Sequence, residues 1–217
     1  MRNGLKVIPN SNQSKTKKSN MNSLKFIKKA VAQIGIFAAI LFIISCNNSP
    51  KTEDTKENAE EHNEAKFDNN NQEKDAQFLV NAAEIDLQEI KLGQLAQQLG
   101  RTASVKELGK AMENAHTNSL NELTALAKSK MVTIPTSTTE NALDAYKKLN
   151  DKSGSDFDKS YADMMVNDHK DAVSVFEKIS TDGNDADVKA WAASTLANLR
   201  MHLDKAMVVQ KEVESLK

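Results

Sequence analysis

The feature that most constrains the fold is a helical repeat of apolar residues in four long segments. Apolar side chains recur every three or four positions within residues 75–100, 104–126, 155–179 and 188–213. This period places them on one side of an α-helix, and four such helices can bury those sides only against one another. The sequence therefore predicts an all-α domain at residues 73–217, a four-helix bundle with a short extra helix at 142–149 between helices two and three.

Composition favours helices over strands. Aromatic residues make up 5% of the chain, which is rich in Ala, Leu, Lys, Glu and Asn. Strands prefer β-branched and aromatic side chains, whereas most of these residues suit helices. Three capping boxes, in which a Ser and an acidic residue three positions later satisfy free backbone amides, predict helix starts at Ser104–Glu107, Ser137–Glu140 and Ser155–Asp158.

Residues 1–45 have the pattern of an export signal. Three lysines within residues 25–29 precede an apolar run at 30–44, which ends at Ser45 and Cys46. A basic start, a short apolar core and a small residue before the cleavage point are typical of a signal peptide. The run is shorter than the ~20 residues that a membrane-spanning helix needs. A lipoprotein signal peptide is therefore predicted, with a permanent membrane anchor as the alternative.

Cys46 is the predicted lipidation site and the predicted link to a membrane. The sequence Ile-Ile-Ser-Cys at 43–46 resembles the bacterial lipobox, in which the Cys is acylated and becomes the first mature residue. Because Asn47 rather than Asp follows it, similarity to lipoprotein sorting rules favours the outer membrane of the cell envelope, on its periplasmic face or at the surface. Residues 46–72 are almost entirely polar and are predicted to form a disordered tether. Met21 is an alternative start of the chain.

The charge of the exported part argues against nucleic acid as a partner. The chain has 29 basic and 30 acidic residues, and eight of the basic ones lie within residues 1–45, which contain no acidic residue. The remainder carries 21 basic and 30 acidic residues, so its net charge is −9. A phosphate backbone would be repelled by such a domain.

Each apolar stripe is interrupted by one polar residue. The four interruptions are Glu89, His116, His169 and His202. Carboxylate and imidazole groups on facing helices are the ligands with which helical bundles hold metal ions in their cores. The pattern predicts a metal site, for which iron, copper and zinc are the candidate ions.

Four further residues are candidate ligands. Glu113 has the Glu-x-x-His spacing that places it on the same face as His116, and Asp168 adjoins His169. Met112 and Met165 each precede one of these histidines by four residues, and a thioether beside an imidazole suits copper. In the alternative interpretation the methionines fill the core and each histidine makes one structural hydrogen bond.

The pattern is incomplete for a di-iron centre. Leu199 stands where a second Glu-x-x-His motif would require Glu. Counting across the predicted turn at 181–184 also places His202 roughly 10 Å along the helix axis from His169. The sequence therefore leaves the metal site and the structural role of the histidines as competing hypotheses.

The segment 154–169 resembles an exported bacterial family catalogued as domain of unknown function 4142 and often labelled an outer-membrane protein. It carries Gly, Phe-Asp, Tyr, Met-Val and Asp-His in that family's order. Ala115 departs from the pattern, because the family usually has Asp before the histidine of helix two. The resemblance implies a ferritin-like four-helix bundle over about residues 75–210 and no settled activity. It marks the positions of Glu89, His116, His169 and His202.

Two functions follow from this reading. The first is a membrane-anchored envelope lipoprotein that binds a metal ion in the core of its bundle. The alternative is a non-enzymatic envelope or stress-related protein that presents a helical face to a partner. An enzyme is the less favoured class, because the chain has no Ser-His-Asp order, no phosphate-binding loop and no Cys-x-x-Cys pair, and Gly93 and Gly109 are single glycines within helices.

Overall fold

The computed structural model describes residues 55–216, which form six α-helices and no strand. This confirms the predicted all-α class. The expected signal peptide, Met21 and the lipidation site Cys46 lie outside the described residues. Within residues 55–216, no helix combines the length and apolar character needed to cross a membrane. The helices are α1 (Thr55–Glu64), α2 (Asn70–Leu99), α3 (Ala103–Lys130), α4 (Glu140–Asn150), α5 (Gly154–Asp182) and α6 (Ala186–Ser215).

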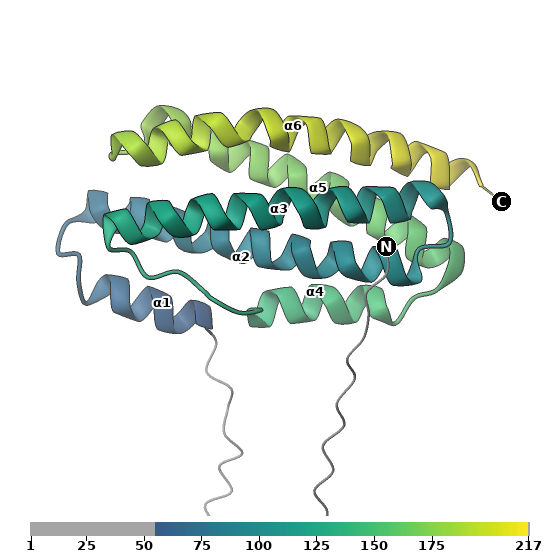
Figure 1. Ribbon diagram of the computed structural model, residues 1–217, viewed down its shortest axis with the longest axis horizontal. Helices are drawn as coiled ribbons and strands as arrows, with labels where there is room; N and C mark the ends of the chain where they lie inside the picture. Colours follow the sequence, from purple (N-terminus) through teal and green to yellow (C-terminus); the bar gives the residue numbers. More distant parts are fainter. Residues whose placement is uncertain (1–54, 217) are drawn as a thin grey trace, which may run out of the picture. The chain divides into compact units, whose positions relative to one another are not determined.

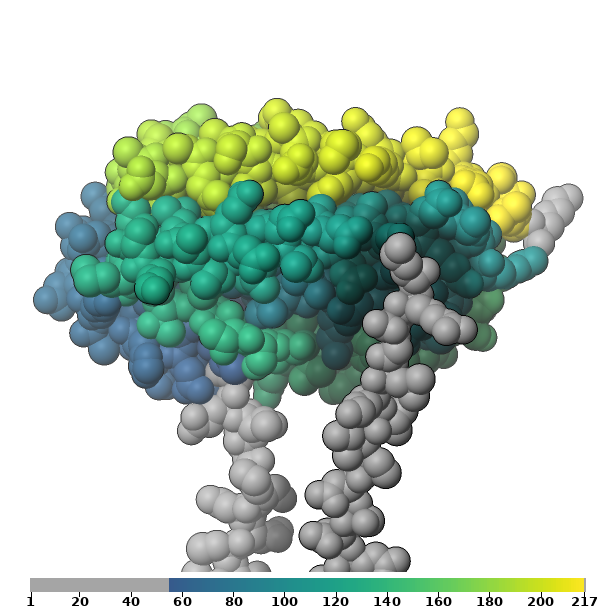
Figure 2. Space-filling model, viewed as in Figure 1, coloured from purple at the N-terminus to yellow at the C-terminus, as the bar shows by residue number. Residues whose placement is uncertain are grey.

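The four long helices pack as two antiparallel hairpins, α2 with α3 and α5 with α6, in a helical bundle (Figure 1). Helices α3 and α6 lie side by side along one face (Figure 2). They run antiparallel, because Ser104 at the start of α3 donates to Glu212, and Lys130 at its end pairs with Asp185. Helices α3 and α5 are therefore parallel, and the connection between them returns along the bundle. The predicted short helix in this connection is confirmed as α4.

The expectation of a disordered tether is wrong for residues 55–64, which form helix α1. Within α1, Ala59 and Asn63 are buried. The Asn63 amide donates to the carbonyl of Thr133, and its oxygen accepts from the Thr133 N–H at 2.8 Å. Lys56 pairs with Glu84 of α2 at 2.6 Å. The polar composition of α1 gave no sign of order because its partners are distant in sequence.

The helices begin at residues other than the predicted caps. Thr102 caps α3 by accepting from the Val105 N–H, and Thr139 caps α4 by accepting from the Ala142 N–H. Helix α5 begins after Ser153, whose side chain makes no capping bond. Asp158 accepts instead from the backbone N–H groups of residues 101 and 102, in the turn between α2 and α3. Each of these three helices thus begins two residues away from the predicted cap.

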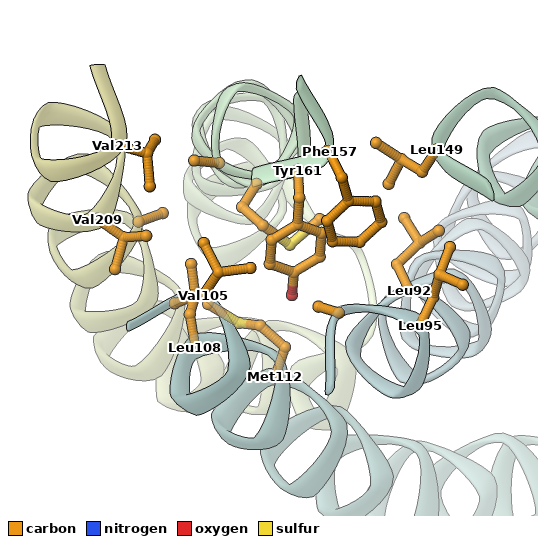
Figure 3. Packing of buried hydrophobic residues seen from close by; sticks show 14 of the residues in the cluster. Leu92, Leu95, Val105, Leu108, Met112, Leu149, Phe157, Tyr161, Val209 and Val213 are labelled. Carbon is orange, nitrogen blue, oxygen red and sulfur yellow. The ribbon is translucent and has the colours of Figure 1, made fainter. Parts of the chain in front are cut away.

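The apolar core has two parts separated by a polar layer. The first cluster draws on residues 92–96, 105–112, 149, 157–166 and 206–213, and Figure 3 shows its packing around Phe157 and Tyr161. The second draws on residues 78–83, 123–127, 172–176 and 188–199. Each long helix passes from one cluster to the other through a short stretch that belongs to neither. The polar residues predicted on the apolar stripes occupy these stretches.

Candidate metal centre

The polar layer receives one or two side chains from each long helix. Helix α2 supplies Asp86 and Glu89, α3 supplies His116, α5 supplies His169 and α6 supplies His202. The exposed fraction is 3% for Asp86, 1% for Glu89, 3% for His116, 1% for His169 and 4% for His202. Polar side chains buried to this extent are unusual unless they are paired or coordinate an ion.

The three imidazoles lie against one another. The ring centroids are 5.6 Å apart for His116 and His169, 5.6 Å for His116 and His202, and 5.5 Å for His169 and His202. One ring nitrogen from each can be chosen such that all three lie within 4.8 Å of one another. These histidines are therefore close enough to share a single ion.

The expected axial offset of His202 from His169 is wrong. Helix α5 continues to Asp182, so the turn to α6 is centred on residue 184 rather than earlier. Counting from there, His202 lies opposite about residue 166. The remaining offset of roughly three residues, about 4.5 Å at 1.5 Å per residue, is spanned by the side chains.

Hydrogen bonds orient two of the rings. The Nδ1 of His169 lies 2.8 Å from the carbonyl oxygen of Met165, and since a carbonyl can only accept, this nitrogen carries the proton. The Nε2 of neutral His169 therefore has a free lone pair. The Nδ1 of His116 lies 2.7 Å from Oδ1 of Asp86. When Nδ1 donates to this carboxyl group, Nε2 of His116 is likewise free to bind an ion.

Several atoms of the layer have no hydrogen-bond partner. Among residues 55–216, buried atoms without one include Nε2 of His116 and His169, Nδ1 of His202, Oδ2 of Asp86 and both carboxyl oxygens of Glu89. Each unsatisfied buried group is disfavoured by about 1–3 kcal/mol. Nitrogen and oxygen acceptors converging in this way fit a divalent transition-metal ion, for which imidazole and carboxylate are ordinary ligands.

Burial keeps the imidazoles neutral. It lowers the pKa of His116 and of His169 to about 4 and that of His202 to about 3. In His169 and His202 the neighbouring imidazoles contribute to the same shift. Neutral imidazole is the form that binds metal ions, so the three rings are ready to coordinate at neutral pH.

Burial also raises the pKa of Asp86 and of Glu89 well above their usual values, and for Glu89 the charges of Asp168 and Asp86 add to the effect. Burial therefore disfavours the charged form of both partners in the contact between His116 and Asp86. A bound cation would favour the ionised carboxylates.

The other predicted ligands are placed differently. Glu89 faces the core but is not in the group of three mutually close residues. Glu113 accepts from the side-chain amides of Gln94 and Gln97, which hold it at the α2–α3 seam. Asp168 accepts from Gln88, and burial raises its pKa to about 6. Met112 and Met165 belong to the first apolar cluster, where Figure 3 shows Met112 near Tyr161.

Two residues that the sequence reasoning missed accompany the histidines. Asp86 lies one helical turn before Glu89, so the same periodicity could have found it. It provides a carboxyl group beside His116, the histidine that follows Ala115 where the family usually has Asp. The Tyr161 hydroxyl is fully buried without a hydrogen-bond partner in the described chain, and both burial and the charge of Glu89 raise its pKa. No spacing in the sequence marks Tyr161 as more than a core residue.

The comparisons with known proteins concern the same stretch of chain. Residues 59–209 match the family described as Domain of unknown function (DUF4142). The match covers more than half of the chain. No curated protein and no solved structure matches it. The chain therefore belongs to the DUF4142 family, as the resemblance of residues 154–169 implied.

Proposed function

We propose that this protein binds one transition-metal ion between His116, His169 and His202. The observation that carries the proposal is the convergence of three buried imidazoles from three helices, each with a buried nitrogen that lacks a hydrogen-bond partner. Removing such groups from water without a ligand is unfavourable, whereas one ion would satisfy all three nitrogens together.

The donor set favours a single ion rather than a pair. Three imidazoles, with the buried carboxyl group of Glu89 in the same polar layer, suit Zn²⁺, Fe²⁺ or Cu²⁺. A two-metal centre needs more bridging carboxylates, and Glu113 is bonded to Gln94 and Gln97 instead. The parallel α3 and α5 helices, joined by a long connection, support a ferritin-like bundle around this centre. A bound ion supplies Lewis-acid or redox chemistry, and we propose binding rather than a reaction.

Elemental analysis tests the proposal. The full chain, purified without a polyhistidine tag, is dialysed against Zn²⁺, Cu²⁺ or Fe²⁺ and then against buffer alone. We expect about one ion per chain to remain, and the double substitution His116→Ala with His169→Ala to abolish retention. The matched control is His62→Ala, because His62 is exposed on α1. Wild-type protein that retains no more metal than the double variant would refute the proposal.

We also propose that the bundle is held in the bacterial cell envelope by a lipid on Cys46. The support is the lipobox-like sequence after a basic and apolar leader. In cells given a fatty acid with a clickable tag, the wild type should be labelled and found with outer membranes. Cys46→Ala should be unlabelled. Equal labelling of the two, with Cys46→Ala still in the membrane fraction, would rule out this attachment.

The alternative is an interaction protein whose histidines are structural. The outer face of α6 favours it, since Met201, Met207 and Val208 are exposed by 44%, 40% and 67%. Under this alternative, a deletion strain complemented with His116→Leu, His169→Leu or His202→Leu has the same phenotype as one complemented with the wild type. A strain rescued by the wild type but not by a folded His169→Leu variant at normal levels would decide for the metal site.

A further inference from the structure

A pocket leads from the surface to the polar layer. It has a volume of about 180 Å³, far above the ~10–15 Å³ that one water requires. It is lined by residues of α2, α3 and α6 and by Phe176 of α5, and its buried polar residues are Asp86, His116 and His202. Among these, Nε2 of His116 and Nδ1 of His202 are buried nitrogens without a hydrogen-bond partner in the described chain.

The outer end of the pocket is polar and acidic. Glu122, Asn118 and Asn198 line it and are exposed, and Met201 lies beside them with 44% of its surface accessible. No lysine or arginine lines the pocket in the part of the chain that the structure describes. A cation entering here therefore meets the carboxylate of Glu122 and the amide oxygens of Asn118 and Asn198 before it reaches the histidines.

We propose that this pocket is the path by which the metal ion reaches and leaves the three histidines, and that Glu122 at its mouth attracts the incoming cation. The proposal rests on the metal site itself. It predicts that the ion exchanges without unfolding of the bundle. It also assigns Glu122 a kinetic role, since an exposed carboxylate beyond the coordinating group changes the rate of capture more than the final affinity.

Metal-loading kinetics test the path. The metal-free full chain is mixed with Co²⁺ at low salt, and the visible bands of the imidazole-bound ion are followed in time. Glu122→Gln should slow association about 2–6-fold, the effect expected for one charge acting on a divalent ion at about 8 Å with partial screening. The difference should vanish at high salt. The matched control is Glu107→Gln, which removes the same charge on α3 about four helical turns away and should load at the wild-type rate.

A second variant tests the pocket by filling it. Ala115 lines the pocket, and Ala115→Leu adds bulk there without removing a ligand. It should slow Co²⁺ binding and release by the same factor and leave the equilibrium occupancy unchanged. Wild-type rates in both Glu122→Gln and Ala115→Leu, with normal occupancy, would overturn the path but not the site. Wild-type protein that develops no Co²⁺ bands would overturn the site and the path together.

Discussion

At the scale of single residues, the contact between Asp86 and His116 is the one that we expect to influence the proposed metal site most. The carboxyl group orients the ring and increases the basicity of Nε2 when Nδ1–H donates to it. Asp86→Asn keeps an acceptor but loses the negative charge, so we expect metal affinity to fall about 10–100-fold. Competition with a chelator of known affinity measures this change.

The control for Asp86 is Asp163→Asn, an exposed carboxylate on α5 that accepts from Gln210. This substitution should leave metal affinity unchanged. If Asp86→Asn binds the ion as tightly as the control, Asp86 takes no part in the site.

Glu89 should destabilise the metal-free protein at neutral pH. Its pKa in the folded state is raised well above the usual 4.5, so above that pH the unfolded chain releases a proton that the folded chain keeps. The contribution of Glu89 to stability therefore falls as the pH rises above 4.5. Glu89→Gln removes this dependence.

We accordingly expect Glu89→Gln to raise the free energy of unfolding in chelator, and to raise it more at pH 7 than at pH 5. Urea denaturation at the two pH values provides the measurement. An equal change at both pH values would mean that Glu89 is ionised in the fold, contrary to the direction of its pKa shift.

At the scale of the helices, the hairpin of α2 and α3 depends on two glycines that the sequence presented as isolated. A Cβ atom built on Gly93 would lie 2.5 Å from the carbonyl oxygen of Gly109, and one built on Gly109 would lie 2.7 Å from that of Gly93. These contacts are with backbone, so the helices would have to separate. The sequence does not reveal this close approach, because it depends on two glycines that lie on different helices.

Gly93→Ala should therefore destabilise the protein, although Ala favours helix by about 1 kcal/mol over Gly. Overpacking typically costs about 1–3 kcal/mol, and we expect it to exceed the gain in propensity. Urea denaturation compares this variant with Asn121→Ala, an exposed substitution on α3. A Gly93→Ala protein as stable as the wild type would show that the crossing tolerates a methyl group.

The two hairpins also cap each other at opposite ends. Asp158 of α5 accepts from the N–H groups of residues 101 and 102, and Asp75 of α2 accepts from those of residues 184 and 185. The aspartates are 83 residues apart, as are the turns they hold. Sequence periodicity predicted the helices but not these bonds, because each joins segments more than 50 residues apart.

Loss of either aspartate should loosen a hairpin turn. Asp158→Ala leaves two part-buried N–H groups without their acceptor, and we expect it to lower the free energy of unfolding by about 2–5 kcal/mol. Asp158→Asn, which keeps one acceptor oxygen, should lie between Ala and the wild type. Chemical denaturation of the three proteins measures the order, and equal stabilities would contradict the capping role.

At the scale of the whole molecule, the sequence predicted the helices and the inward position of three histidines because both follow from one periodicity. The polar interruptions of the stripes at His116, His169 and His202 do meet. The sequence could not reveal that α1 is ordered, since its buried face depends on Asn63 meeting Thr133. The position of His202 along the helix axis was also predicted wrongly. An error of two residues in the turn between two helices shifts the facing residues by several ångströms.

The central claim is that one ion is held by these three imidazoles, and X-ray absorption spectroscopy of the protein loaded with one equivalent of Zn²⁺ tests it most directly. The account predicts three nitrogen ligands at about 2.0–2.1 Å with the multiple-scattering pattern of imidazole, and the loss of one in His202→Ala. A shell of oxygen ligands without imidazole, unchanged in that variant, would contradict it.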